Sequence, residues 1–344
     1  MSNSANLSFE NSNNEVRNEV ESFLEMLSHA LSIAKNVSIS NSKPNINKII
    51  FSGMGGSGIV AKIIKSLLVE QKIVVEAIDC QTLPMWADKE TLFVPISYSG
   101  NTYETLEACR GAIARNCQIY AISSGGELEQ LSHDKQFFHL KFDRECQPRS
   151  SFPYLFILAL KIIQELNLIE NINYSELIKK LTKNNNEYMD KDFMSTFEKI
   201  LACDAMVFYG NGNLKYAALR AKTQINENSK SFASWEYLTE SNHNAIEGLR
   251  DKTLKLGIVL FDSKFKTENE KNQTEAFVSL LENNKLIYRI LKFDDADSKI
   301  EEIFMAVLLA DYISYYLAEQ NGYMSMAVQN ISYVKEAVKA LGEK

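Results

Sequence analysis

The sequence predicts an α/β protein built from two similar subdomains, each with a mainly parallel sheet flanked by helices. Two observations support this fold class. Short apolar runs alternate with helical stretches in both halves of the chain, a pattern typical of βαβ units with buried parallel strands. Each half also contains a Gly-x-Gly sequence directly after an apolar run, at Gly53-Met54-Gly55 and at Gly210-Asn211-Gly212. One duplicated unit explains both observations; two unrelated turns that each need glycine are the alternative.

The first half begins with an N-terminal arm. Apolar residues from Val16 to Leu31 recur at helical spacing and indicate an amphipathic helix that docks on the rest of the protein. Five short apolar runs then predict strands, at 49–51, 73–75, 92–94, 118–122 and 137–138. A long helical stretch from residue 153 to about 168 closes this subdomain.

The second half repeats the plan. A polar segment at 183–187 interrupts the apolar periodicity and marks the expected domain junction. Strands are expected at 205–209, 256–260 and 286–290, and helices at 213–224, 269–281 and 301–318. The predicted organisation is an N-terminal arm and helix at 1–47, a phosphate-binding subdomain at 48–180, and a second subdomain with a C-terminal helix at 187–344.

Composition and charge exclude several classes of protein. The 344 residues are 45% hydrophobic and 24% charged, which is ordinary for a globular protein and excludes a disordered or fibrous one. The net charge of −7 provides no basic field for nucleic acid. The N-terminus lacks a signal-peptide pattern, no apolar run reaches the roughly 18 residues of a membrane span, and the five cysteines form no CxxC pair. We therefore expect a cytoplasmic protein with reduced thiols that binds neither nucleic acid nor membrane.

A glycine-rich loop follows the first predicted strand. Four glycines lie within residues 53–58, and a helix beginning near Ser57 would direct its free N–H groups at a bound anion. A dinucleotide also fits this loop, with Asp79 at the end of the next strand as the residue that would hold a ribose.

A second loop favours a terminal phosphate over a dinucleotide. Ser97, Ser99 and Thr102 precede a helix expected to begin near Tyr103. Hydroxyl donors together with backbone N–H groups suit a compact phosphate dianion, whereas an ordinary N-cap explains one hydroxyl and not three. The corresponding segment of the second half, 261–265, lacks glycine and contains a carboxylate, so no phosphate is expected there. The predicted phosphate ligands are Gly56, Ser57, Ser97, Ser99 and Thr102.

These two loops resemble those of the sugar isomerase (SIS) fold, which binds phosphosugars. Further motifs occur in the order seen in bifunctional phosphoglucose/phosphomannose isomerases, namely Leu83-Pro84-Met85-Trp86, Ser123-Ser124-Gly125-Gly126-Glu127-Leu128, Gln147-Pro148-Arg149, Asn226-Glu227-Asn228 and Asn242-His243-Asn244. The resemblance extends from about Lys48 to Lys335. It implies two SIS-type subdomains, a homodimer, and interconversion of an aldose 6-phosphate with fructose 6-phosphate without a metal or an organic cofactor.

The resemblance also implies catalytic roles for four residues. Aldose–ketose isomerisation needs a base that moves a proton between C2 and C1, and a group that stabilises the enediolate. The resemblance gives these roles to Glu227 and Arg149. It gives ring opening to His243, contributed across the dimer interface, and to Lys335. The first subdomain would anchor the substrate, and the second would supply Glu227 and His243.

Taken without the resemblance, the same residues have ordinary explanations. Glu227 is one of 44 acidic residues and fits a solvated carboxylate at a helix end, where a negative charge is mildly unfavourable unless a cation lies nearby. Arg149 fits a surface ion pair, and His243 fits an incidental loop histidine. Packing or surface roles are adequate for the other histidines, His29, His133 and His139.

The chain departs from the family pattern at three places. Thr239 stands where the family usually has proline, Lys62 where it has an acidic residue, and 324–328 where a proline-rich stretch is expected. These departures leave open whether glucose 6-phosphate alone or also mannose 6-phosphate is accepted. A non-catalytic regulatory SIS protein that senses sugar phosphate is the main alternative. The isomerase half of an amidotransferase is disfavoured because Ser2 stands where such enzymes expose a cysteine.

Overall fold

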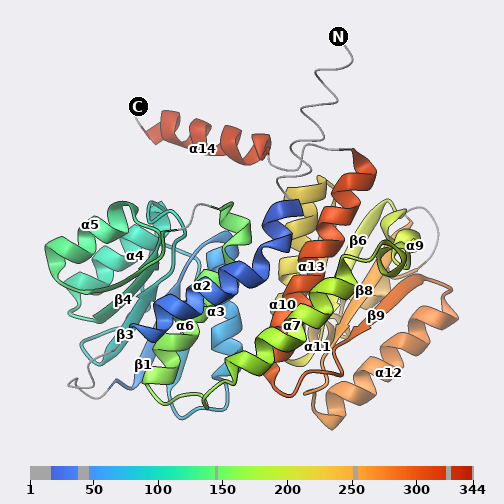
Figure 1. Cartoon of the computed structure of the whole chain (residues 1–344), viewed down its shortest axis with the longest axis horizontal. Coiled ribbons are helices and arrows are strands. Elements are labelled where there is room, and N and C mark those ends of the chain that lie inside the picture. The colour runs from blue at the N-terminus through green and yellow to red at the C-terminus, as the bar shows by residue number, and fades with distance from the viewer. Residues whose placement is uncertain (1–16, 38–45, 144–145, 251–254, 323–326, 343–344) are drawn as a thin grey trace. The chain divides into compact units, whose positions relative to one another are not determined.

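The computed structural model describes residues 17–37, 46–143, 146–250, 255–322 and 327–342. The chain divides into two compact units. We call residues 22–183 with 297–301 the N-terminal unit, and residues 1–21 with 184–296 and 302–344 the C-terminal unit. Each unit contains one parallel sheet flanked by helices, which confirms the predicted fold class (Figure 1).

The sheet of the N-terminal unit has the strand order β2-β1-β3-β4-β5, and all its neighbouring strands are parallel. The strands are β1 (Lys48–Ser52), β2 (Val74–Ile78), β3 (Thr91–Pro95), β4 (Gln118–Ser123) and β5 (Phe138–Lys141). The five predicted strands are therefore confirmed, although β2 and β5 begin one residue later than expected. The central strands β1 and β3 are buried along nearly their whole length, which is why the sequence shows continuous apolar runs there.

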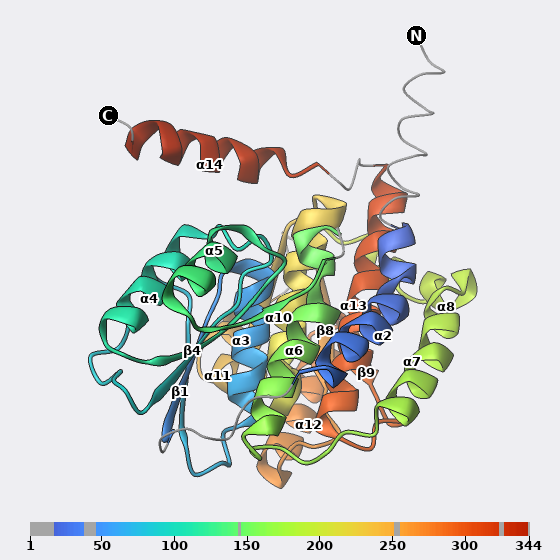
Figure 2. The same ribbon diagram turned by 60° about the vertical axis from the view of Figure 1, so that its left-hand side comes forward.

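Helices cover the sheet of the N-terminal unit. They are α2 (Phe23–Lys35), α3 (Gly55–Leu67), α4 (Tyr103–Ala114), α5 (Gly126–Lys135) and α6 (Phe152–Glu165). Helix α6 is buried on almost every side because α2, α3 and β4 all pack against it. Figures 1 and 2 both show α2 lying along α6, so the predicted N-terminal docking helix is confirmed, with Val16 outside the described residues.

The sheet of the C-terminal unit has the order β7-β6-β8-β9, again all parallel. Its strands are β6 (Ala205–Gly210), β7 (Ala233–Tyr237), β8 (Leu256–Asp262) and β9 (Ile287–Lys292). Strand β7 was not predicted, because it is an edge strand of half-buried, mixed residues that presents no apolar run.

The remaining helices include several that the sequence did not predict. Long ones are α7 (Tyr174–Tyr188), α10 (Lys215–Gln224), α12 (Glu268–Asn283), α13 (Lys299–Asn321) and α14 (Gln329–Gly342), and short ones are α8 (Lys191–Ser195), α9 (Glu198–Leu201) and α11 (Leu238–Ser241). The polar segment 183–187 belongs to α7 and is helical. Among the described residues, no helix combines the length and the apolar character that crossing a membrane requires.

The two Gly-x-Gly turns have the same backbone conformation. Gly55 and Gly212 have φ values of 51° and 50°, a left-handed conformation that favours glycine. Gly53 and Gly210 are required for a different reason: a Cβ on them would lie 2.9 Å from the Ile96 carbonyl oxygen and 2.6 Å from the Lys215 Cα, respectively. Both turns join a central strand to a helix at the carboxyl edge of a sheet.

At a third glycine, Gly100, the loop after β3 packs closely against the turn after β4. Gly100 has φ 67°, and a Cβ on it would lie only 1.8 Å from the carbonyl oxygen of Gly125. The contact is secured on both sides, since Leu128 N donates to Gly100 O (2.9 Å) and Glu127 N donates to Asn101 Oδ1 (2.9 Å). The conformation of the 97–102 loop therefore depends on glycine at position 100.

Replacing Gly100 by alanine should destabilise the N-terminal unit by more than about 2 kcal/mol, because left-handed backbone alone costs other residues roughly 1–2 kcal/mol and the added Cβ overlaps the Gly125 carbonyl. The two tryptophans, Trp86 and Trp235, lie in different units. In a Trp235→Phe background, Trp86 fluorescence during urea unfolding therefore reports the N-terminal unit. Gly248→Ala is the control, since a Cβ there meets nothing within 4 Å. Equal urea midpoints for the two alanine variants would contradict the prediction.

Candidate functional site

Two helix N-termini lie side by side at the carboxyl edge of the N-terminal sheet. Helix α3 starts after β1 and α4 starts after β3, and these strands are paired neighbours. Neither N-cap residue, Met54 for α3 or Thr102 for α4, makes a side-chain capping hydrogen bond. The N–H groups of both first turns are thus without a side-chain cap, which is the arrangement that receives a phosphate or another anion.

The predicted phosphate ligands lie at these two helix starts. Gly56 and Ser57 are in the first turn of α3. In the other loop, Ser97 is buried, with its hydroxyl 3.0 Å from that of Thr102 and accepting from Gly100 N (3.1 Å). Ser99 is exposed, and its hydroxyl accepts from Asn101 N (3.2 Å). The structure therefore places hydroxyls and uncapped N–H groups along one edge of the sheet.

The segment that carries Arg149 lies against both loops. The Tyr98 hydroxyl donates to Cys146 O (2.5 Å) and accepts from Cys146 N (3.0 Å), which ties residue 146 to the hydroxyl loop. The carbonyl oxygen of Pro148 lies 3.7 Å from the position of a Cβ on Gly56. Arg149 itself, in the short 3-10 helix η1 (Pro148–Ser150), is only 6% exposed. The structure thus places a buried permanent cation near the start of the two helices.

Two of the other histidines have structural roles. His139 Nε2 lies 2.7 Å from the Ser123 hydroxyl, which also donates to the carbonyl oxygen of Gly125 (2.9 Å). Burial lowers the pKa of His139 to about 4, so its imidazole is neutral near pH 7. His29 Nδ1 lies 2.8 Å from the Tyr154 hydroxyl, between α2 and α6. These contacts agree with the packing roles expected for both residues.

Glu227 lies on an irregular helical turn. Helix α10 continues directly into η3 (Ile225–Ser229), a single π-helical turn that ends at Lys230 with φ 56°. Glu227 is half-buried in the middle of this turn. Single π-turns are rare and are frequently found at functional sites. The sequence predicted a carboxylate near a helix end, but the π-turn that presents it has no sequence signal.

Helix α13 holds this turn in place. Arg220 of α10 makes two hydrogen bonds to Asp311 of α13, Nε to Oδ1 at 3.1 Å and Nη2 to Oδ2 at 2.7 Å, and both residues are buried. Asn228 Nδ2 donates to the Ser314 hydroxyl (2.9 Å), which fixes the turn one residue after Glu227. Charge-assisted bidentate pairs are geometrically specific. The orientation of the π-turn thus follows from its contacts with α13.

Glu227 lines a cavity of about 530 Å³. Asn226, Lys230 and residues 327–331 complete the lining. The Lys230 ammonium contacts the backbone carbonyl of Glu227, so a cation lies at this helix end. Sequence reasoning missed Lys230, because only the left-handed end of the turn directs this side chain back toward Glu227.

His243 and Lys335 are both exposed. His243 is in the turn after α11, where its backbone N donates to Glu240 O (3.0 Å). Nearby on β7, burial raises the pKa of the Glu236 carboxyl, and the charge of Glu240 adds to this effect. Lys335 is on α14, whose apolar residues Ile331, Val334 and Val338 are also exposed. Within the described ranges, no hydrogen bond or ion pair joins Glu227, His243 and Lys335 to one another.

Two of the departures from the family pattern have visible structural consequences. Lys62 forms an ion pair with Asp79 (2.9 Å), which lowers the pKa of that carboxyl. The residue that a dinucleotide would require is therefore already bonded. The Thr239 hydroxyl oxygen is buried and has no hydrogen-bond partner in the described part of the chain. Residues 324–326 lie outside the described residues. Across the described ranges, no three His, Cys, Asp or Glu side chains gather as metal ligands.

Comparison with known proteins identifies related families for both halves. The family described as "Bacterial phospho-glucose isomerase C-terminal SIS domain" matches residues 194–338, and the SIS domain family matches residues 44–137. A bifunctional phosphoglucose/phosphomannose isomerase of Caldicellulosiruptor bescii is 30% identical over 310 residues, which cover 86% of this chain and 90% of the relative.

Two further matches show the breadth of the similarity. A D-glucosamine-6-phosphate 4-epimerase of Sulfolobus acidocaldarius is 31% identical over 203 residues, covering 58% of this chain and 63% of the relative. The solved C-terminal domain of glucosamine-fructose-6-phosphate aminotransferase from Francisella tularensis superposes with a TM-score of 0.68 at 16% identity, covering 90% of this chain and 96% of that domain. This last similarity concerns the fold alone.

Proposed function

This chain belongs to the family of bifunctional phosphoglucose/phosphomannose isomerases, and from this premise we propose that it interconverts glucose 6-phosphate and fructose 6-phosphate. The chain is a phosphosugar isomerase by its family. The observation that most supports the specific reaction is Glu227, presented on a π-turn into a cavity large enough for a small molecule. A base held in this way suits proton transfer between adjacent carbons.

We propose that the N-terminal unit binds the substrate phosphate. The uncapped first turns of α3 and α4 supply N–H groups, and Ser57, Ser97, Ser99 and Thr102 supply hydroxyls. Arg149 is buried, and its segment is bonded to Tyr98 of the hydroxyl loop through the Cys146 backbone. We assign it the stabilisation of the enediolate, whose negative charge develops during the reaction.

In the proposed chemistry, Glu227 removes the proton from C2 of the open-chain aldose. The electrons of that C–H bond form the C1–C2 double bond, and the C1 carbonyl oxygen takes up the negative charge of the enediolate. The proton of the C2 hydroxyl then passes to the C1 oxygen. As the C2 carbonyl forms, the electrons of the C1–C2 double bond take the proton back from Glu227 at C1, which gives the ketose. Glucose 6-phosphate and mannose 6-phosphate differ only in configuration at C2, and this centre is planar in the enediol. We therefore propose mannose 6-phosphate as a second substrate, in agreement with the name of the C. bescii relative. His243 and Lys335 are assigned to ring opening.

We further propose that the protein acts as a homodimer in which His243 of the partner subunit serves the site. His243 is exposed, and it forms no hydrogen bond or ion pair with Glu227 of its own chain. Both features are expected of a residue that serves the site of a partner subunit. The apolar residues of α14 are also exposed, which is unfavourable in an isolated chain. The cytoplasm is the proposed location, and small sugar phosphates are the proposed ligands.

Replacing Ser97 and Ser99 together by alanine should weaken binding of fructose 6-phosphate at least 100-fold. Hydrogen bonds to charged groups contribute roughly 1.5–3 kcal/mol each, and about 1.4 kcal/mol corresponds to a tenfold change in Kd. Isothermal titration calorimetry measures the change. Ser66→Ala is the control, because Ser66 is near the opposite end of α3, where its hydroxyl donates to Ile63 O of the same helix. Wild-type affinity in the double variant would exclude the phosphate assignment.

Replacing Glu227 by glutamine should lower kcat by about 10²–10⁴-fold while substrate binding survives, because general-base catalysis supplies that factor and glutamine keeps the size of the side chain. A coupled assay with glucose 6-phosphate and mannose 6-phosphate, compared side by side, measures turnover. Exchange of the C2 hydrogen in deuterated water measures proton abstraction directly. Glu319→Gln, a change at an exposed carboxylate of α13, is the control. Wild-type exchange by Glu227→Gln would show that another group is the base.

Mixing inactive Glu227→Gln and His243→Ala proteins should restore part of the activity once subunits exchange. A mixed dimer would contain one site with both wild-type groups if His243 comes from the partner subunit. Turnover is followed after mixing, with exchange verified by mass spectrometry of differently tagged chains, and each variant mixed with itself is the control. Verified exchange without any recovery would indicate that both groups serve the site of their own chain.

A further inference from the structure

The loop after β8 corresponds to the hydroxyl loop after β3. Both strands lie next to the strand that bears the Gly-x-Gly turn, and both loops lead into a helix, α12 in one unit and α4 in the other. The sequence led us to expect that Asp262 would occupy the phosphate position in this second loop. The structure shows a different arrangement, because Asp262 Oδ1 is bonded to Asn211 Nδ2 (2.6 Å) and Lys266 Nζ (2.7 Å).

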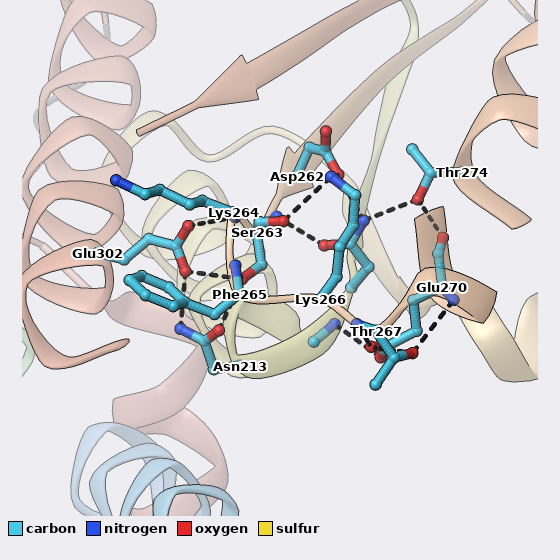
Figure 3. A network of polar contacts seen from close by, with 12 residues as sticks. Asn213, Asp262, Ser263, Lys264, Phe265, Lys266, Thr267, Glu270, Thr274 and Glu302 are labelled. Atoms are coloured by element: carbon cyan, nitrogen blue, oxygen red, sulfur yellow. Dashed lines mark hydrogen bonds and ion pairs between the residues drawn. The ribbon is translucent and has the colours of Figure 1, made fainter. Parts of the chain in front are cut away.

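The carboxylate that enters the loop belongs to Glu302 of α13 (Figure 3). Its Oε1 accepts from the backbone N of Lys264 (2.6 Å), and its Oε2 accepts from Asn213 Nδ2 (2.9 Å) and lies 2.7 Å from the Ser263 hydroxyl. Glu302 is 0% exposed. A backbone N–H, a hydroxyl and an amide around one anionic group are the same types of donor that hold a phosphate in a loop at a sheet edge.

A second internal carboxylate fills the neighbouring helix start. Glu270 accepts from the backbone N of Gly212 (3.2 Å) and from Thr267 N (2.8 Å), and Thr267 in turn caps α12 in a capping box. Gly212 is the counterpart of Gly55 in the N-terminal unit. There the situation is reversed, since within the described residues no carboxylate contacts Ser57, Ser97, Ser99 or Thr102.

Burial of Glu302 has an energetic cost that its donors offset. Desolvation raises the pKa of this carboxyl, and the nearby Asp262 raises it further, whereas the hydrogen bonds from Lys264, Ser263 and Asn213 lower it. An ionised carboxylate persists in a buried position only where such donors surround it. The loop therefore forms an environment that favours an oxyanion, and the Glu302 carboxylate of the same chain is that oxyanion.

We propose that residues 213 and 263–264 form an oxyanion cradle whose permanent ligand is the Glu302 carboxylate, so that the C-terminal unit binds no phosphate unless this side chain is removed. Of the two corresponding loops, the one in the N-terminal unit is then the loop that remains open to phosphate. This proposal concerns an oxyanion site in one unit and does not rest on the isomerase reaction.

The full-length Glu302→Ala variant tests the proposal with sodium formate as the probe. Formate carries the carboxylate that the substitution removes and fits the space that the shortened side chain leaves. Thermal unfolding is compared in formate and in chloride at equal ionic strength. The variant should have a lower Tm than the wild type in chloride, and formate should raise it saturably by several degrees. The wild-type Tm should respond equally to both salts. An equal response of the variant to both salts would overturn the proposal.

Two further variants separate a cradle from a general salt effect. Glu302→Gln fills the same space with a neutral amide, so formate and chloride should affect it equally. Adding Ser263→Ala to Glu302→Ala removes one donor and should raise the formate concentration needed for half-maximal rescue several-fold; unchanged rescue would contradict the proposed donor set. If Glu302→Ala does not fold in chloride, refolding yields in the two salts give the same test. Equal yields, including equal failure, would contradict the proposal. Stability is the readout, so a failed isomerase assay leaves this result unaffected.

Discussion

The buried pair of Arg220 and Asp311 determines where Glu227 lies. A buried ion pair adds little net stability, but losing one partner leaves an uncompensated charge and typically costs about 3–5 kcal/mol. The pair therefore restricts α10 to one position on α13. The π-turn that follows α10 is an unfavourable backbone conformation, and two contacts with α13 maintain it. Asn228 of the turn donates to the Ser314 hydroxyl, and Asn321 of α13 donates to Ser229 O and to the Ser231 hydroxyl. The position of Glu227 thus depends on α13 as much as on the π-turn itself.

The two units differ less in fold than in how their helix N-termini are satisfied. The N–H groups that a parallel sheet collects at its carboxyl edge must have partners. In the C-terminal unit, Glu302 and Glu270 supply these partners from within the chain. In the N-terminal unit, α3 and α4 have no side-chain caps, and a buried Arg149 lies beside them. In our proposal, which of the two units binds an anion therefore depends on a few carboxylates and not on the strand order.

The sequence predicted the parts of the structure that depend on burial along a strand. Apolar runs located eight of the nine strands found in the described residues. The inner strands show them because central parallel strands are covered on both faces, and the edge strands β2, β5 and β9 carry short ones as well. Edge strand β7 is half-buried and gave no such signal. In the candidate site, the sequence predicted only the residues that belong to recognisable motifs. Lys230 and Glu302 were missed for physical reasons: one acts through a left-handed residue at the end of a π-turn, and the other is hidden in the apolar pattern of α13.

The departures from the family pattern differ in how far their effects reach. Lys62 replaces an acidic residue, but its partner Asp79 neutralises it locally, and neither residue contacts the hydroxyl loop. Thr239 replaces a proline and leaves a buried hydroxyl without a partner among the described residues, a condition that costs about 1–3 kcal/mol. It directly precedes Glu240, whose carbonyl oxygen accepts from His243 N. Of these two departures, Thr239 is thus the one that adjoins the turn carrying His243, and a proline at this position would remove the unpartnered hydroxyl.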